Sequence, residues 1–156
     1  MQDPGLTAGP LLIPDRDPAA ATTGIRLSLA VPTYNESANI VPLLQALTEV
    51  LDATLADAWE VIVVDDDSPD GTAQLAQRFA ATAPRVQVLR RTGERGLSTA
   101  VIRGWQLARG DVLGVIDGDL QHPPEVLGAL WREIALGNDL CVASRHIGGG
   151  ATATTC

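Results

Sequence analysis

The sequence predicts an α/β fold, a doubly wound and mostly parallel sheet with helices on both faces. Short, β-branched apolar runs that mostly do not alternate with polar residues are typical of strands buried on both sides. Between them lie longer segments whose apolar residues recur at three- and four-residue steps, as on one face of a helix. In such a sheet the ligand binds beyond the carboxyl ends of the strands, so the residues after each strand are the functional candidates.

The apolar runs predict five strands, at residues 27–31, 61–64, 86–89, 112–116 and 140–143. The first helix is expected after the first strand, with Ser37 as its N-cap and an apolar stripe formed by Ile40, Leu43, Leu44, Leu47, Val50 and Leu51. Further helices are expected at 72–81, 97–108 and 124–136. The last begins at Pro124, whose missing N–H costs little in a first turn.

Composition divides the 156 residues into one folded domain and two ends. Residues 1–24 are rich in proline and glycine without periodicity, which predicts a disordered tail. Residues 25–147 form the expected domain, and 148–156 a flexible end rich in glycine and threonine. The isolated Cys141 and Cys156 indicate neither a disulfide framework nor a zinc site.

Charge limits the possible partners. The net charge is −8 and the chain has no lysine, which argues against a nucleic-acid surface. An anionic ligand must then be held by arginines, backbone amides or a metal ion. No apolar stretch is long enough to span a membrane and no signal region is recognisable, so a soluble, cytosolic chain is expected. The sequence predicts no particular oligomeric state.

The first two strand ends carry polar and aromatic residues. After the first strand, Pro32-Thr-Tyr-Asn-Glu36 contains neither a glycine-rich dinucleotide turn nor a P-loop, and it fits either a ligand loop or a simple helix-capping turn. After the second, Asp65-Asp-Asp-Ser-Pro-Asp-Gly-Thr72 contains a tight turn that accounts for residues 67–71. Of the two remaining carboxylates, Asp66 is favoured as an acceptor for a base N–H or a ribose hydroxyl.

The fourth strand end, Asp117-Gly-Asp-Leu-Gln121, offers two carboxylates and an amide oxygen, a set suited to Mg²⁺ or Mn²⁺. We expect Gly118 to allow backbone angles that a β-carbon would forbid, so that both carboxylates turn toward one site. A solvated loop with a helix cap is the alternative, and His122 is expected to be a loop residue. After the fifth strand, Arg145 could clamp a phosphate or lie on the surface, and glycines 148–150 begin a mobile loop.

Five motifs together resemble family 2 glycosyltransferases, and within them the dolichol-phosphate (polyprenol-phosphate) mannosyltransferases. They are Val31-Pro-Thr-Tyr-Asn-Glu36, Val64-Asp-Asp-Asp-Ser-Pro-Asp-Gly-Thr72, Gly96-Leu-Ser-Thr-Ala-Val-Ile-Arg-Gly104, Asp117-Gly-Asp-Leu-Gln-His-Pro-Pro-Glu125 and Ala143-Ser-Arg145. Each is weak alone, but five in order, each at a strand or helix boundary, are specific. The resemblance covers about residues 26–150.

The resemblance implies a GT-A fold, a Rossmann-like sheet that binds a nucleotide-sugar, usually GDP-mannose. It assigns the nucleoside to Pro32, Tyr34, Glu36 and Asp66, and the metal and diphosphate to Asp117, Asp119 and Gln121. It implies catalytic roles for Asp119 and for Arg145, which would engage phosphate. Family members commonly have alanine where this chain has Gly118, a change that removes no metal ligand.

The implied reaction is an inverting transfer of a sugar, mannose from GDP-mannose, to a polyprenyl or dolichyl phosphate at the cytoplasmic face of a membrane. The acceptor phosphate is already anionic, which fits the lack of an obvious Ser–His or Cys–His pair. The family's catalytic domain continues well past the Ser-Arg motif, so the chain is expected to be C-terminally truncated relative to it.

Two alternatives remain open, a non-catalytic nucleotide-sugar-binding domain and a polyprenyl-phosphate glucosyltransferase that uses UDP-glucose. Two further enzyme classes are disfavoured. A metal-dependent phosphatase or phosphotransferase is disfavoured because it needs a lysine for the phosphoryl group. A sugar nucleotidyltransferase is disfavoured because its glycine-rich signature after the first strand is missing.

Overall fold

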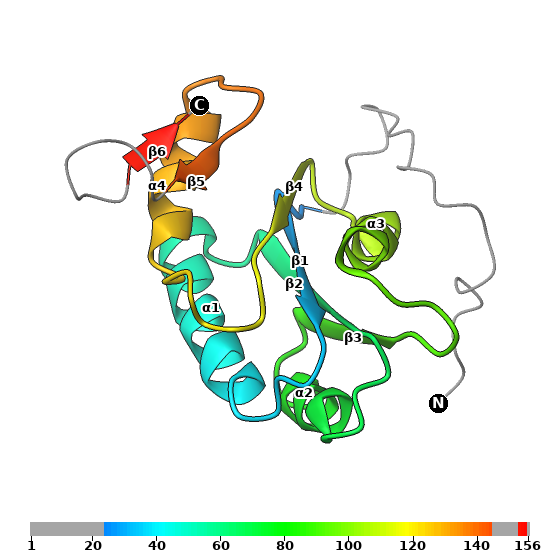
Figure 1. Cartoon of the computed structure of the whole chain (residues 1–156). Coiled ribbons are helices and arrows are strands. Elements are labelled where there is room, and N and C mark those ends of the chain that lie inside the picture. The colour runs from blue at the N-terminus through cyan, green and yellow to red at the C-terminus, as the bar shows by residue number, and fades with distance from the viewer. Residues whose placement is uncertain (1–23, 145–152, 156) are drawn as a thin grey trace.

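A computed structural model describes residues 24–144 and 153–155 (Figure 1). Four parallel strands form the main sheet, in the order β3-β2-β1-β4. The strands are β1 (Leu27–Thr33), β2 (Trp59–Asp65), β3 (Val86–Arg90) and β4 (Val112–Val115). The helices between and after them are α1 (Ile40–Leu55), α2 (Thr72–Ala80), α3 (Leu97–Leu107) and α4 (Val126–Ala135). This confirms the predicted Rossmann-like, doubly wound fold with its four helices.

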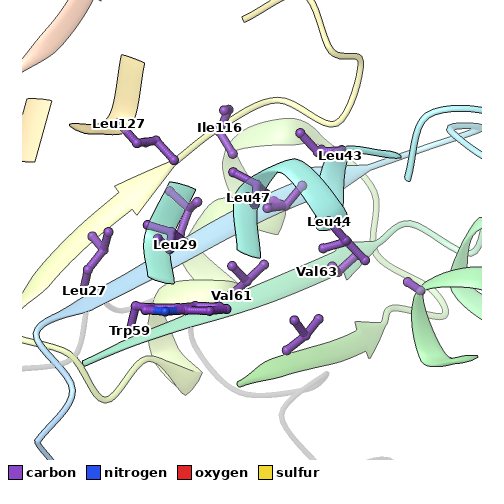
Figure 2. Packing of buried hydrophobic residues seen from close by; sticks show 14 of the residues in the cluster. Leu27, Leu29, Leu43, Leu44, Leu47, Trp59, Val61, Val63, Ile116 and Leu127 are labelled. Carbon is purple, nitrogen blue, oxygen red and sulfur yellow. The ribbon is translucent and has the colours of Figure 1, made fainter. Parts of the chain in front are cut away.

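Helices cover both faces of the sheet because the central strands are apolar on both sides. Every residue of β1 and β2 is buried. On one face, side chains of both strands pack against α1, with α2 and α4 beside it; Figure 2 shows Leu29, Val61 and Val63 next to Leu44 and Leu47. On the other face, Ile62, Val64 and Leu89 pack against Ala100 of α3. In the sheet, β2 and β3 lie on one side of β1 and β4 lies on the other, so the strand order reverses at β1.

A buried carboxylate ties the strands together at the start of β2. Glu60 is fully buried and accepts hydrogen bonds from Ser28 Oγ of β1 (2.6 Å) and Gln87 Nε2 of β3 (3.0 Å). It also accepts from the Arg109 backbone N–H (2.6 Å) and forms an ion pair with the Arg109 guanidinium (2.8 Å). Since a buried charge is tolerated only when it is paired and hydrogen-bonded, this network holds the α3–β4 connection against the sheet.

The prediction of a fifth strand in the parallel sheet is wrong. The strand β5 (Val142–Ser144) instead pairs antiparallel with β6 (Ala153–Thr155) in a separate two-stranded sheet. The apolar run that predicted it is largely solvent-exposed, with Leu140 at 70% and Val142 at 54% exposure, so it does not enter the core. β6 lies within the end that was expected to be flexible.

Two further predictions concern the start of α1 and the N-terminal tail. Ser37 does not cap α1, because Asn39 holds the N-cap position and makes no side-chain cap bond. The predicted disordered tail lies outside the described residues, apart from Gly24. Among the helices described, none combines the length and apolar character that crossing a membrane requires.

Alanine substitutions at two helical glycines distinguish the effect of packing on stability from the effect of helix propensity. A β-carbon at Gly104 in α3 would lie 3.0 Å from Ala30 Cβ and 3.1 Å from Val64 Cγ2, whereas one at Gly128 in α4 would meet nothing closer than Thr54 Oγ1 at 3.7 Å. We expect Gly128→Ala to raise the free energy of unfolding by about 0.5–1 kcal/mol. Gly104→Ala should lower it by about 1–3 kcal/mol because it overpacks the α3–sheet contact. Urea unfolding followed by tryptophan fluorescence measures both, and equal shifts in the two variants would contradict the packing argument.

Candidate functional site

The loops that follow β1, β2 and β4 lie at the carboxyl ends of the strands, and each contains a non-glycine residue in the left-handed backbone region. These residues are Asn35 (φ 58°), Asp67 (φ 56°) and Leu120 (φ 59°). Asparagine and aspartate tolerate this region, but for leucine it is strained. Such strain persists only where the surroundings enforce it, and it is concentrated at functional sites.

Side chains of the β2–α2 loop hold the β1–α1 loop in place. Three consecutive backbone N–H groups of the first loop, at residues 35, 36 and 37, donate to three side chains of the second. The acceptors are Ser68 Oγ (3.0 Å), Thr72 Oγ1 (2.9 Å) and Asp70 Oδ2 (3.0 Å), respectively. The turn predicted at residues 67–71 therefore also positions the loop that carries Tyr34 and Glu36.

Two aspartates, Asp65 at the end of β2 and Asp70 in the β2–α2 loop, have structural roles. Asp65 is fully buried and accepts from the Ser68 backbone N–H (2.8 Å), Ser68 Oγ (2.6 Å) and Thr33 Oγ1 (3.1 Å). Asp70 accepts from Thr72 Oγ1 at 2.6 Å, and this hydroxyl lowers the pKa of Asp70 from 3.8 to about 2, aided by the Ser37 and Thr72 backbone N–H groups. Both carboxylates thus hold the two loops through the hydrogen bonds that they accept.

A pocket of about 260 Å³ lies between the β1–α1 loop and the start of α3. It is lined by Pro32, Thr33, Tyr34, Asp66, Arg95, Gly96, Leu97 and Ala100. Three of the four residues predicted to hold a nucleoside, Pro32, Tyr34 and Asp66, are therefore brought together. The fourth, Glu36, does not line the pocket, and its carboxylate accepts from Asn39 Nδ2 at 2.7 Å.

Asp66 shapes the pocket as well as lining it. Its Oδ1 accepts from Arg91 Nε (2.7 Å) and forms an ion pair with Arg91 Nη2, and its Oδ2 accepts from the Gly96 backbone N–H (2.8 Å). Arg91 is completely buried and also donates to Thr99 Oγ1 (2.9 Å) and the Gly96 carbonyl (3.1 Å). Asp66 and Arg91 together hold the segment 91–96, whose residues Arg95 and Gly96 form the second wall of the pocket.

Sequence reasoning missed Arg91. A recognisable signal was present, because Arg90 ends β3 and Arg91 follows it, at the same end of the sheet as the three aspartates 65–67, the first of which ends β2. In the structure Arg90 forms an ion pair with Asp67, and Arg91 with Asp66. Nearby, hydrogen bonding from the Arg103 guanidinium holds the pKa of Glu94 below its usual range.

The acidic turn after β4 packs against the end of β1. A β-carbon at Gly118 would lie 2.9 Å from Thr33 Cγ2 and 3.2 Å from the Pro32 carbonyl oxygen. Gly118 is not in the left-handed region, and Leu120 is, so the predicted reason for this glycine is wrong. The turn lies close to the end of β1, where a β-carbon at residue 118 would crowd Pro32 and Thr33, two residues that line the pocket of about 260 Å³.

Asp117, Asp119 and Gln121 all lie on this turn. Asp117 is exposed at the end of a groove of about 690 Å³ along β4 and α4, which His122 also lines. Asp119 is partly exposed and accepts from the Gln121 backbone N–H at 3.0 Å. Arg145 lies outside the described residues.

The donor set of the turn fits a hard cation. Within residues 24–144, no three acidic, histidine or cysteine side chains are grouped in a way that could hold a metal ion. Two solvent-accessible carboxylates and an amide oxygen nevertheless suit Mg²⁺ or Mn²⁺, because such ions keep several waters and share their remaining ligands with substrate phosphates. They do not suit a structural zinc site, which needs four nitrogen or sulfur ligands.

Comparison with known proteins identifies relatives of this chain. A family model described as glycosyl transferase family 2 matches residues 28–155. A dolichol-phosphate mannosyltransferase of Pyrococcus furiosus is 46% identical over 126 residues, which cover 81% of this chain and 35% of that protein. A polyprenol monophosphomannose synthase of Mycolicibacterium smegmatis is 39% identical, with 86% of this chain and 50% of that protein covered. The chain thus spans about a third to a half of the length of these relatives.

A solved structure shares the fold. A mannosyltransferase from Pyrobaculum calidifontis, in complex with GDP-Man and Mn²⁺, matches with a TM-score of 0.55 and 33% identity. The match covers 64% of this chain and 29% of that protein.

The lowered pKa of Asp70 predicts a pH dependence of stability. A carboxyl whose pKa is lower in the folded than in the unfolded chain stabilises the fold above the unfolded value, and this contribution is lost as the pH falls through about 2. We expect Asp70→Asn to be less stable than the wild type at neutral pH. The difference should shrink from about pH 5 down to about pH 2.5, as measured by urea unfolding.

The matched control is Asp57→Asn, which removes an exposed carboxylate that forms no ion pair in the described part of the chain. Its stability difference from the wild type should stay nearly constant over the same pH range. An Asp70→Asn difference that is equally constant would show that this carboxylate does not hold the loops.

Proposed function

Because this chain belongs to glycosyl transferase family 2, we propose that it forms the donor-binding part of an inverting glycosyltransferase that acts on a polyprenyl phosphate. The observation that carries the proposal is the pairing of two features at one end of the sheet. The nucleoside pocket is lined by Pro32, Tyr34 and Asp66, and the acidic turn contacts this pocket's own residues at Gly118. A nucleotide-sugar needs both features side by side, one for the base and one for the diphosphate.

The proposed donor is GDP-mannose. The exposed faces of Tyr34 and Leu97 offer apolar surface to a base, and Asp66 offers a carboxylate oxygen to a base N–H. Asp117, Asp119 and Gln121 would hold Mg²⁺ or Mn²⁺, which neutralises charge on a diphosphate when bound. The related mannosyltransferase that was solved with GDP-Man and Mn²⁺ supports this assignment.

The proposed reaction needs no protein base. An oxygen of the acceptor phosphate attacks the anomeric carbon, the bond from that carbon to the β-phosphate oxygen breaks, and the nucleoside diphosphate leaves with inverted configuration at the sugar. Negative charge grows on the leaving diphosphate, so the predicted roles of Asp119 at the metal and Arg145 at phosphate are to stabilise this charge. A lipid acceptor would bring the reaction to a membrane surface, and its cytoplasmic face is part of the proposal.

Binding tests the donor site. We expect calorimetry to detect binding of GDP-mannose in the presence of Mn²⁺, and Asp119→Asn to weaken it by roughly tenfold or more because the turn loses a charged ligand. The control is Asp111→Asn, an exposed carboxylate just before β4, at the far end of the strand from the turn. If Asp119→Asn binds GDP-mannose and Mn²⁺ like the wild type, the turn is not the diphosphate site.

Transfer tests the reaction. We expect radiolabelled mannose to pass from GDP-mannose to a polyprenyl phosphate in vesicles, and the rate to fall by about 10²-fold or more in Asp119→Asn. Label that passes only from UDP-glucose would identify a glucosyltransferase. Binding of GDP-mannose without any labelled lipid would identify a nucleotide-sugar-binding domain that does not catalyse transfer by itself.

A further inference from the structure

The rim of the nucleoside pocket carries an arginine to which neither the sequence motifs nor the proposed reaction gives a role. Arg95 lines the pocket, and its guanidinium carbon lies 5.2 Å from the centre of the Tyr34 ring. In residues 24–144, the Arg95 side chain takes part in none of the ion pairs. It is held at the pocket by the aromatic ring rather than by a carboxylate.

Among the described residues, the carboxylates near Arg95 are already paired with other arginines. Asp66 is paired with Arg91, and Asp67 with Arg90. Glu94, next to Arg95 in sequence, is paired with Arg103 and Arg91. A guanidinium stacked on a ring keeps its N–H donors in its own plane, where they stay available to a ligand.

The pocket therefore presents donors and an acceptor around an apolar slot. Arg95 supplies donors at the rim, and Asp66 supplies a carboxylate oxygen; Asp66 already accepts from Arg91 and Gly96, which leaves roughly one of its four lone-pair positions for a ligand. Leu97 and Ala100 line the apolar part beside the Tyr34 ring. A planar base with two adjacent acceptors on one edge and an N–H donor on another complements these groups.

We propose that Arg95 selects the nucleobase of the donor, by donating to the O6 and N7 acceptors of guanine while Asp66 accepts from the guanine N–H edge. Bidentate pairing of arginine with O6 and N7 is the commonest specific contact to guanine in protein–DNA complexes, and the same two acceptors are present in a guanine nucleotide. Adenine presents an amino donor in place of O6, so it would oppose the guanidinium. This inference rests on the proposed function and specifies which class of nucleotide the pocket takes.

The test compares two diphosphates that differ only in their purine. We expect calorimetry to show that the wild type binds GDP at least tenfold more tightly than ADP. Arg95→Gln should lower the affinity for GDP by about tenfold and change the affinity for ADP by less than about twofold, so that the preference for GDP is lost. The control is Arg78→Gln, which removes an exposed arginine from the last turn of α2 and should leave both affinities unchanged.

Three results would overturn the inference alone, while GDP binding to the wild type upholds the donor site. The first is an equal loss of affinity for GDP and ADP in Arg95→Gln, which would place the guanidinium on the diphosphate. The second is no loss of affinity for either nucleotide in that variant, and the third is a wild type that binds ADP as tightly as GDP. A wild type that binds no guanine nucleotide would overturn the donor site and this inference together.

Discussion

The hydrogen bonds from the β1–α1 loop to the β2–α2 loop are the interaction on which the site depends. A loop after a buried strand has backbone N–H groups that must find acceptors, and here three successive ones are satisfied by Ser68, Thr72 and Asp70. The second loop is itself fixed by the buried carboxylate of Asp65. The position of Tyr34 at the pocket therefore follows from side chains more than thirty residues away in sequence.

The second wall of the pocket depends on a buried ion pair. Such a pair stabilises a fold only when its remaining hydrogen-bonding groups are also satisfied, and Arg91 meets this condition through Asp66, Thr99 and the Gly96 carbonyl. Removing the Asp66 carboxylate would leave a buried guanidinium without its main partner. A loss of nucleotide affinity in an Asp66 variant would thus combine a lost ligand contact with a displaced wall.

The sequence predicted the parts of this molecule that local patterns determine. Continuous apolar runs and helical stripes identified four strands and four helices, and their alternation identified the sheet edge where Pro32, Tyr34 and Asp66 meet. It could not predict relations between distant segments. The apolar run at 140–143 looked like a core strand because a sequence does not show whether a run is covered. The pairing of Arg91 with Asp66 and the left-handed backbone at Leu120 likewise depend on contacts across loops.

The close approach of Gly118 to Thr33 and Pro32 joins the acidic turn to the end of β1, from which the β1–α1 loop begins. A cation that orders the turn and a nucleotide that orders the loop would therefore share part of one conformational cost. On the proposed function, whichever ligand bound first would lower that cost for the second, and thermodynamic linkage would require each to raise the affinity of the other by the same factor. The lack of a β-carbon at residue 118 would then be one determinant of the coupling free energy between metal and nucleotide, a property that belongs to neither binding site alone.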